Sequence, residues 1–312
     1  MADAPIFDKL ALIGLGLIGS SIARAARASN AVREIAALDA SPLVLARVRE
    51  LDIADVVTDD WAGGLRGADL VIICAPVGVS GEIAEQIAPH LESGAVLSDV
   101  GSVKAAVVAQ VAPHVREDAH FIPAHPIAGT EYSGPDAGFA TLFQNRWCIL
   151  TPPDGADEKT VGKLSAFWTR LGAKVETMTP AHHDLVLAVT SHLPHLIAYN
   201  IVGTAADLEE VTRSEVIKFS ASGFRDFTRI AASDPTMWRD VFLNNKDAVL
   251  EMLGRFDEDL TALQRMIRRG DGEGLFDLFT RTRAIRRSII EQGQDTAAPD
   301  FGRRGEEDGK RQ

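Results

Sequence analysis

Short apolar runs and amphipathic stretches alternate along the chain as far as Thr179. The apolar runs are typical of buried strands and cover residues 9–14, 34–38, 70–75, 95–99, 120–123, 146–151 and 174–177. In the stretches between them, apolar residues recur every three or four positions, which predicts helices over residues 17–28, 42–51, 79–91, 103–111 and 158–171. Apolar strands that alternate with helices are typical of a mostly parallel sheet covered on both faces. We therefore predict a doubly wound α/β domain over residues 1–179.

The pattern after Thr179 is helical, because no further strand-like run occurs. From Trp238 onward, apolar residues three or four positions apart predict one long amphipathic helix, through Val241, Phe242, Val249, Leu253, Phe256, Leu260, Leu263 and Ile267. The pair Asp234-Pro235 is a suitable start for this helix and Gly270 a suitable end. At 1.5 Å per residue the helix would be about 50 Å long, which is more than the width of a small domain.

Part of this apolar stripe is therefore expected to pack against a second chain. We predict an all-helical substrate and dimerisation domain over residues 180–293, and the alternative is a monomeric helical bundle that packs the stripe internally. Residues 294–312 are charged, contain glycine and have few aliphatic side chains, so we predict a disordered tail there.

Composition narrows the classes of partner. Lys and Arg number 32 against 44 Asp and Glu, which gives a formal charge of -12 and opposes binding to nucleic acid or to an anionic membrane. Two cysteines, Cys74 and Cys148, can form neither a disulfide framework nor a four-thiolate zinc site. We find no secretory leader and no run of about 18 apolar residues. We expect a soluble cytoplasmic protein without a metal site.

A glycine-rich motif follows the first predicted strand and opens the first predicted helix. Gly14, Gly16 and Gly19 match the G-x-G-x-x-G pattern of dinucleotide-binding Rossmann domains. Gly14 would allow the tight turn, Gly16 the close approach of a pyrophosphate, and Gly19 the close packing of helix on strand. The amino terminus of the helix would bind the phosphates, so we assign Leu17 and Ile18 to the cofactor site as well.

Asp39 stands twenty residues after Gly19, at the end of the second predicted strand. A carboxylate at this place accepts hydrogen bonds from the adenosine ribose and would repel the 2′-phosphate of NADP, so we predict NAD as the cofactor. The alternative role of Asp39 is to cap the helix that begins at Pro42. At the end of a later strand, Ala75 and Pro76 are assigned to the same cofactor site.

Three polar segments follow later strands or lie in the helical half. Ser102 could be a plain helix cap or part of the site. His125 is expected in a loop at the edge of the sheet where ligands bind, and such a histidine is a candidate for proton transfer. Arg225 and Arg229, four residues apart, would share one helical face and could clamp a carboxylate, with Lys218 and Arg213 just upstream. The alternative for this cluster is a surface of salt bridges.

His192 and His195 are three residues apart and follow His182 and His183. No Cys, Asp or Glu nearby completes a recognisable metal-ligand set, so a polar role in a pocket between the domains is favoured over a metal site. Cys74 and Cys148 lie in apolar strands and are expected to be inert.

Taken together, these segments resemble the prephenate dehydrogenase family, which includes arogenate and cyclohexadienyl dehydrogenases. The residues that carry the resemblance are GLGLIGSS at 14–21, Asp39, DVGSVK at 99–104, HPIAGTEYSG at 125–134, TSHLPH at 190–195 and GFRDFTRIAASDPTMW at 223–238. The likeness extends from Lys9 to about Ile290. The tail shows no regulatory domain of the kind that some members append, so we expect no feedback through a separate tyrosine-binding module.

The resemblance implies an NAD-dependent oxidative decarboxylation of prephenate, arogenate or both, in tyrosine biosynthesis. It implies that His125 is the catalytic group, which accepts the proton of the ring hydroxyl, and that Ser102 orients it. It also implies that the substrate pocket is lined by His192 and His195 and that Arg229 binds a substrate carboxylate. In such dimers Thr130, Glu131, Asp226 and Trp238 gather at the pocket mouth, some from the partner subunit, and Glu131 and Asp226 restrain the arginine.

Two other interpretations stay open at this point. The chain could be another dehydrogenase with a Rossmann domain and a helical domain, acting on a small hydroxy acid, although such enzymes should lack the His-Pro-x-Ala-Gly loop. It could also be a non-catalytic protein that senses NAD. The sequence does not distinguish prephenate from arogenate, because the two differ only at the α carbon of the side chain.

Overall fold

The computed structural model describes residues 4–207, 215, 218–219 and 221–291. Arg213 and the predicted tail over residues 294–312 lie outside the described residues. The chain divides into two compact units, Met1–Met252 and Leu253–Gln312, and each is described separately. The predicted domain division after Thr179 stays a prediction.

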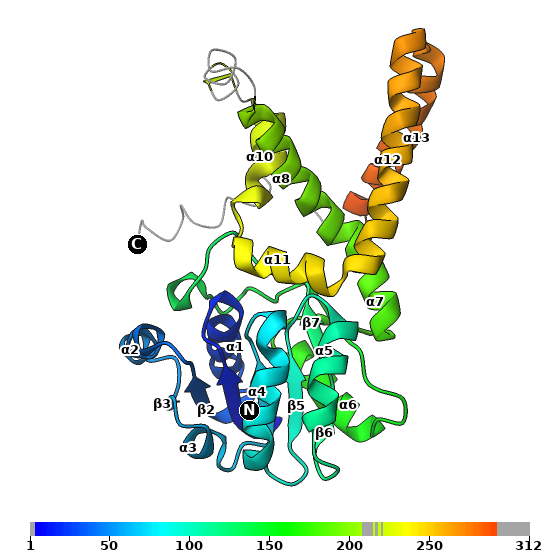
Figure 1. Ribbon diagram of the computed structural model, residues 1–312. Helices are drawn as coiled ribbons and strands as arrows, with labels where there is room; N and C mark the ends of the chain where they lie inside the picture. Colours follow the sequence, from blue (N-terminus) through cyan, green and yellow to red (C-terminus); the bar gives the residue numbers. More distant parts are fainter. Residues whose placement is uncertain (1–3, 208–214, 216–217, 220, 292–312) are drawn as a thin grey trace. The chain divides into compact units, whose positions relative to one another are not determined.

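The centre of the larger unit is a parallel sheet with the strand order β3-β2-β1-β4-β5-β6 (Figure 1). Its strands are β1 (Phe7–Ile13), β2 (Val32–Leu38), β3 (Val56–Thr58), β4 (Leu70–Ile73), β5 (Val96–Asp99) and β6 (His120–Phe121). The connecting helices are α1 (Leu17–Ala28), α2 (Pro42–Leu51), α3 (Trp61–Leu65), α4 (Ser80–Ile87), α5 (Lys104–Val111) and α6 (Glu158–Arg170). The predicted doubly wound fold is confirmed. The short elements β3 and α3 were missed, because three or five residues are too few to show a period.

The side chains of β1 point alternately to the two faces of the sheet, and each face has its own apolar core. Leu10 and Leu12 belong to the core that contains Ile22 of α1 and Phe167 of α6. Ala11 and Ile13 belong to the core beneath α3, α4 and α5. Because successive side chains of a strand point to opposite faces, an apolar run buried on both sides needs this two-layered cover.

A second, three-stranded sheet follows, with the order β7-β8-β9. It consists of β7 (Ala124–Pro126), β8 (Trp147–Leu150) and β9 (Lys174–Thr177), and β7 runs antiparallel to β8. The strand predicted over residues 120–123 is therefore shorter than expected, because β6 ends at Phe121 and the chain re-enters a different sheet at Ala124. Pro123, which has no N–H to donate to a ladder, stands at this break.

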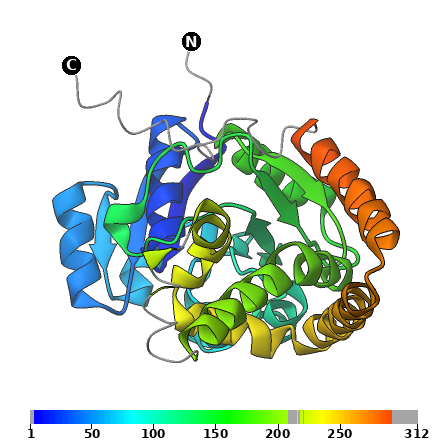
Figure 2. The same cartoon turned by 90° about the horizontal axis from the view of Figure 1, so that it is seen from above.

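The helices of the larger unit after β9 are α7 (Pro180–Leu187), the π-helical turn η5 (Ala188–His192), α8 (Leu193–Ala206), α10 (Ser222–Thr228), the short 3-10 turn η6 (Arg229–Ala232) and α11 (Pro235–Asn244). α11 packs on η1 (Val77–Val79), the turn that follows β4, so these helices lie over the edge where the parallel strands end (Figures 1 and 2). This is the edge at which doubly wound sheets bind ligands.

The continuous helical run Pro180–Ala206 is long and apolar enough to cross a membrane by length and composition alone, with a mean hydropathy of 1.4. The run is not unbroken in the sequence, because histidines and an aspartate interrupt it. Of these side chains, His183, Asp184 and His192 make buried polar contacts with the rest of the unit.

The single long helix predicted between Asp234 and Gly270 is wrong. The chain forms α11 and then α12 (Lys246–Arg269), with a break at Asn245, where φ is -116° and ψ is 31°. The Asn245 side chain donates hydrogen bonds to the backbone oxygen of Asp184 and to Nδ1 of His192, and these tertiary contacts hold the break. The predicted start and end are confirmed, because Asp234 caps α11 and Gly270 has a φ of 66°.

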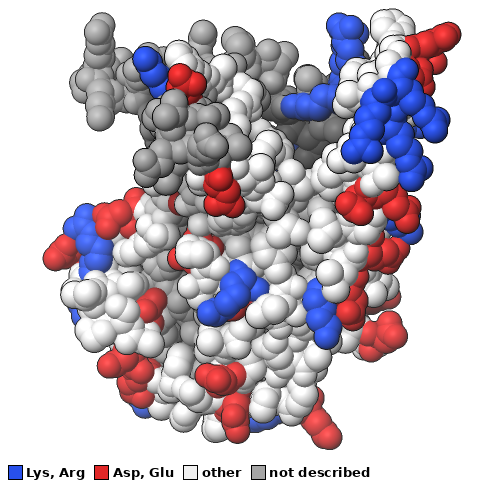
Figure 3. Space-filling view, turned by 45° about the horizontal axis from the view of Figure 1, so that its top comes forward, with Lys and Arg blue, Asp and Glu red and all other residues white. Residues whose placement is uncertain are grey.

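The smaller unit contains most of α12 and all of α13 (Gly272–Glu291). Large apolar side chains are exposed on both helices, namely Leu260, Ile267, Phe276, Phe279 and Ile285. α13 also carries Arg281, Arg283, Arg286 and Arg287, and basic side chains gather over these helices (Figure 3).

Candidate active site

The glycine-rich loop between β1 and α1 has the conformation that a dinucleotide requires. Gly14 has a φ of 95°, and a Cβ there would lie 2.8 Å from the backbone oxygen of Cys74. A Cβ on Gly19 would lie 2.1 Å from the backbone oxygen of Gly14. Packing therefore explains both of these glycines. A Cβ on Gly16, in contrast, would meet no protein atom within 4 Å, so the space beside Gly16 is open to a ligand.

The first turn of α1 begins at Leu17, and Gly16 at its N-cap supplies no side-chain hydrogen bond. The N–H groups of Leu17, Ile18 and Gly19 have no acceptor within the helix, which leaves them for an anion. Ala75 lies beside the loop, since its backbone nitrogen would be 3.3 Å from a Cβ on Gly14, and Pro76 leads into η1. These residues fit the pyrophosphate part of NAD.

Asp39 is tied to this loop by its side chain. Its Oδ2 accepts a hydrogen bond from the N–H of Leu15 at 2.9 Å, and its Oδ1 accepts one from the N–H of Ser41 at 2.9 Å. The alternative role as helix cap is wrong, because the Ser41 hydroxyl caps α2 by accepting from the N–H of Val44. Each carboxylate oxygen retains a lone pair for a ribose hydroxyl, so Asp39 fits the adenosine end of NAD.

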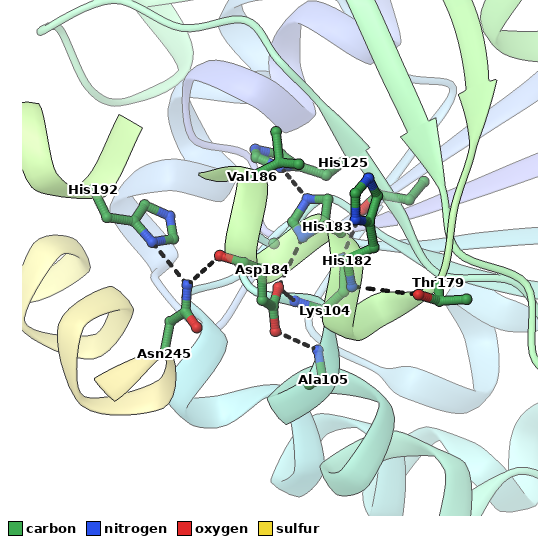
Figure 4. Close-up of polar contacts among 12 residues, drawn as sticks. Lys104, Ala105, His125, Thr179, His182, His183, Asp184, Val186, His192 and Asn245 are labelled. Carbon is green, nitrogen blue, oxygen red and sulfur yellow. Dashed lines mark hydrogen bonds and ion pairs between the residues drawn. The ribbon is translucent and has the colours of Figure 1, made fainter. Parts of the chain in front are cut away.

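His125 is buried in the short strand β7 and not, as expected, in a loop. It pairs with Ile149 of β8, and its Nδ1 lies 2.9 Å from Nε2 of His183 in α7. Nδ1 of His183 in turn lies 2.8 Å from Oδ1 of Asp184 (Figure 4). The three side chains therefore form a continuous polar chain that ends at His125.

Asp184 also binds the amino terminus of α5. Its Oδ1 accepts a hydrogen bond from the N–H of Lys104 at 2.7 Å and its Oδ2 one from the N–H of Ala105 at 2.9 Å. The plain capping role considered for Ser102 is therefore wrong, because Val103 is the N-cap residue and supplies no side-chain bond. Within the described part of the chain, no hydrogen bond links the Ser102 hydroxyl to His125.

His183 and Asp184 were not among the predicted site residues. Some 80 residues separate Asp184 from the helix that it caps, and no local pattern predicts such a contact. The one available signal was a histidine and an aspartate inside an otherwise apolar helical run, where polar side chains have to find buried partners.

The surroundings of His125 favour its neutral form. Burial lowers the pKa of His125 well below its ordinary value of 6.5, and positive charge on His183, Lys104 or His192 lowers it further. Burial also lowers the pKa of His183, although the hydrogen bond to Asp184 opposes this shift. A neutral imidazole at the ligand-binding edge of the sheet can accept a proton.

The predicted pocket histidines lie against Trp238 of α11. The ring of His195 stacks on the Trp238 ring with centroids 3.7 Å apart, and His192 meets it edge-on at 6.0 Å. Nδ1 of His195 donates to the backbone oxygen of Ser191 at 2.8 Å, since a carbonyl can only accept. In the described part of the chain, His192 Nε2 and Trp238 Nε1 are buried without a hydrogen-bond partner.

Arg229 forms an ion pair with Glu131, with 2.9 Å between Nη1 and Oε2. Burial lowers the pKa of His195, and the positive charge of Arg229 adds to this shift. Arg225 does not share one regular helical face with it, because α10 ends at Thr228 and the chain tightens into η6 at Arg229.

Two further predicted substrate-binding residues, Arg225 of the arginine cluster and Thr130 of the pocket mouth, lie nearer the surface. The Arg225 side chain is largely exposed, and its Nε is 3.9 Å from Asp226. Thr130 is exposed, and its hydroxyl accepts a hydrogen bond from the N–H of Tyr132. Among the described residues, no group of three or more His, Cys, Asp or Glu is arranged to hold a metal ion.

Two family models match successive parts of the chain. Residues 22–177 match the nucleotide-binding domain of prephenate dehydrogenase, and residues 179–281 match its dimerization domain. The chain is 40% identical over 284 residues to cyclohexadienyl dehydrogenase of Zymomonas mobilis, a match that covers 91% of this chain and 97% of that protein. It is 34% identical to prephenate dehydrogenase of Bacillus subtilis, with 87% and 73% covered.

Solved structures agree with these matches. The crystal structure of prephenate dehydrogenase from Aquifex aeolicus in complex with hydroxyphenyl propionate and NAD+ superposes with a TM-score of 0.84 at 33% identity, and 90% of this chain and 98% of that chain are covered. Arogenate dehydrogenase of Synechocystis superposes with a TM-score of 0.76 at 27% identity, with 90% and 99% covered. By sequence, by domain order and by fold, this chain belongs to the prephenate dehydrogenase family.

Proposed function

We propose that this protein catalyses the NAD-dependent oxidative decarboxylation of prephenate, arogenate or both. The observation that carries the proposal is that His125, buried in β7 and bonded to His183, lies at the same edge of the sheet as the glycine-rich loop and Asp39. NAD, when bound, supplies the acceptor for a hydride. The chain therefore has to bind a dianionic cyclohexadienol and remove its hydroxyl proton, and its own residues provide for both tasks.

In the proposed reaction the hydroxyl of the substrate ring gives its proton to Nε2 of His125. The ring carbon that bears the hydroxyl loses its hydrogen as hydride, and its C–O bond becomes a carbonyl. The ring carboxylate leaves as carbon dioxide, and the electron pair of the broken C–C bond enters the ring. Those electrons shift through the ring to the carbonyl oxygen, which takes a proton and becomes the phenol hydroxyl, and the gain of aromaticity drives the loss of carbon dioxide.

The other predicted residues would bind and orient the substrate. Arg229 would exchange its ion pair with Glu131 for a substrate carboxylate. His195 is held flat against Trp238, so its Nε2 is available as an acceptor with little loss of side-chain freedom. Ser102, Thr130, Asp226, Arg225 and His192 stay proposed members of the pocket and its mouth.

The reaction is tested by mixing the purified protein with NAD and either prephenate or arogenate and following NADH absorbance. We expect NADH to form with at least one substrate. Kinetics measured with both substrates would establish whether prephenate or arogenate is preferred. The His125→Asn variant should lose turnover and still bind NAD, as measured by calorimetry. Absence of turnover by the wild-type protein with both substrates would refute the proposal. Near-normal turnover by the variant would refute His125 as the base.

We also propose that the protein is a cytoplasmic homodimer. Exposed apolar side chains on α12 and α13 support a helical interface, as does the description of the matching family domain. In the larger unit, Ile201 and Val202 are exposed apolar side chains on α8. The run Pro180–Ala206 carries His183 and Asp184, which hydrogen bond to β7 and α5, so we assign this helix to the soluble fold.

A further inference from the structure

The polar chain from Asp184 to His125 constrains where each proton lies. Both oxygens of Asp184 accept backbone N–H groups at the start of α5, from Lys104 and Ala105. A carboxylate bound in this way is an acceptor, so the 2.8 Å contact with His183 is donated by Nδ1–H of His183. The fixed amino terminus of α5 thus determines which nitrogen of His183 is protonated.

The next link follows from the chemistry of a neutral imidazole, which carries one proton. Burial favours the neutral form of His183, and its proton is on Nδ1, so its Nε2 has a lone pair. The 2.9 Å contact between that Nε2 and Nδ1 of His125 is therefore donated by His125. His125 is then protonated on Nδ1 and has a free lone pair on Nε2.

We infer that His183 and Asp184 are positioning residues that hold His125 in the Nδ1–H tautomer, with Nε2 ready to accept the substrate proton. When Nε2 of His125 takes that proton, the Nδ1 proton can pass to Nε2 of His183, whose Nδ1–H stays bound to Asp184. The positive charge then lies beside a carboxylate instead of on an isolated buried ring. This inference rests on the proposed role of His125 as the base.

Other groups around His125 do not provide this function. Besides His183, the charges of Lys104 and His192 act on His125, and the Cys148 thiol lies near Lys104, Asp99 and the backbone of His125. Lys104 and Asp99 are engaged with each other and with the backbone of Ala124. His192 is bonded to Asn245, and burial raises the pKa of the Cys148 thiol, which keeps it protonated. Among the described residues, only His183 hydrogen bonds to the ring of His125.

Nitrogen-15 NMR of protein labelled at histidine tests the inference directly, because two-bond proton couplings show which ring nitrogen is protonated. The His125 signals are identified by their absence in His125→Asn. We expect the wild-type spectrum to show His125 protonated on Nδ1. In His183→Leu, which can accept no hydrogen bond, we expect the His125 proton to move to Nε2. His183→Gln places an acceptor oxygen near the position of Nε2 and should retain much of the Nδ1–H form.

The value of kcat should depend on the tautomer of His125. We expect kcat to fall by about 100-fold or more in His183→Leu, as for loss of a general base, while NAD binding is unchanged. His183→Gln should recover part of this loss. His182→Gln is the matched control, because His182 is the exposed neighbour on the same helix. It should behave like the wild type in both measurements.

Three results would overturn the inference: a wild-type His125 protonated on Nε2, a His183→Leu variant with near-normal kcat, or a loss of kcat without a change of tautomer. If His183→Leu fails to fold, the wild-type spectrum and the tautomer and kcat of His183→Gln still test the inference. If the wild-type protein turns over neither substrate, the proposed function fails, whereas the NMR experiment still reports on the proton positions.

Discussion

Lys104 and Asp99 form a buried ion pair, with side chains 0% and 2% exposed, that holds both backbone groups of Ala124. Lys104 Nζ donates a hydrogen bond to the oxygen of Ala124 at 2.7 Å, and Asp99 Oδ1 accepts one from its N–H at 3.3 Å. Ala124 directly precedes His125. The pair therefore connects the end of β5 and the start of α5 to the strand that carries the proposed base.

Replacing Lys104 should destabilise the fold strongly. In Lys104→Met the Asp99 carboxylate would remain buried without its cation, which typically costs about 3–5 kcal/mol. We expect a loss of this size in the free energy of unfolding, measured by urea denaturation. The double variant Lys104→Met with Asp99→Leu should recover part of the loss, because no buried charge is then left unpaired. A loss below about 1 kcal/mol in the single variant would contradict a structural role for the pair.

Activity should persist into mildly acidic solution. Because burial lowers the pKa of His125 well below 6.5, the imidazole stays neutral at pH 6.5 and for some way below it. We expect kcat/KM to be level down to that range and then to fall tenfold per pH unit as His125 takes a proton. The measurement is a pH–rate profile with enzyme returned to neutral pH as a check on reversibility. An acid limb centred at or above pH 6.5 would contradict the assignment.

Stability, in contrast, should decline over the same acidic range. Burial lowers the pKa of His192 from 6.5 to about 4, so between these values the unfolded chain binds a proton that the folded chain does not. The contribution of His192 to the free energy of unfolding is therefore complete above pH 6.5. It falls by roughly 1.4 kcal/mol per pH unit as the pH is lowered toward 4.

The variant His192→Asn isolates this contribution, because its amide oxygen can still accept the hydrogen bond from Asn245. We expect a smaller slope of unfolding free energy against pH between 4 and 6.5, measured by urea denaturation at several pH values. The slopes are compared, not the absolute stabilities, since the variant also changes packing. An unchanged slope would show that His192 takes up its proton in the folded protein.

Arg229→Ala should weaken substrate binding more than it slows chemistry. Loss of a guanidinium that binds a carboxylate is expected to raise KM for the substrate by about 10- to 100-fold, with a much smaller change in kcat. The KM of Arg229→Lys should lie between those of the wild type and Arg229→Ala, since an ammonium keeps the charge but cannot form the bidentate hydrogen bonds of a guanidinium. Arg33→Ala is the control, because Arg33 pairs with Asp8 at the surface, at the start of β2. A fall in kcat at unchanged KM would contradict the binding role.

The exposed apolar residues of α13 should mediate self-association. Phe276 and Phe279 are 69% and 57% exposed and three positions apart, so they share a helix face. We expect sedimentation velocity to show a dimer for the wild-type protein and a monomer for the variant Phe276→Asp with Phe279→Asp. Leu43→Asp, at a still more exposed position on α2, should remain dimeric. A monomeric wild-type protein at micromolar concentration would refute the dimer.

Local patterns along the chain predicted most of the α/β half. The apolar runs predicted the strands, and the glycine spacing and Asp39 predicted the nucleotide loop, because each depends on residues close together in the sequence. The motif around His125 likewise indicated the family. What local patterns misplaced were elements too short for a period, such as β3, and the break at Asn245, where hydrogen bonds to Asp184 and His192 override helical periodicity.

Periodicity and motifs of a few residues were enough to predict the doubly wound fold, the cofactor class and the histidine proposed as the base. No local pattern in the chain indicated that Asp184 caps α5, that His183 lies between Asp184 and His125, or that Lys104 and Asp99 hold Ala124. These contacts form because buried polar groups must find partners, and those partners are selected by the packing of elements up to 80 residues apart.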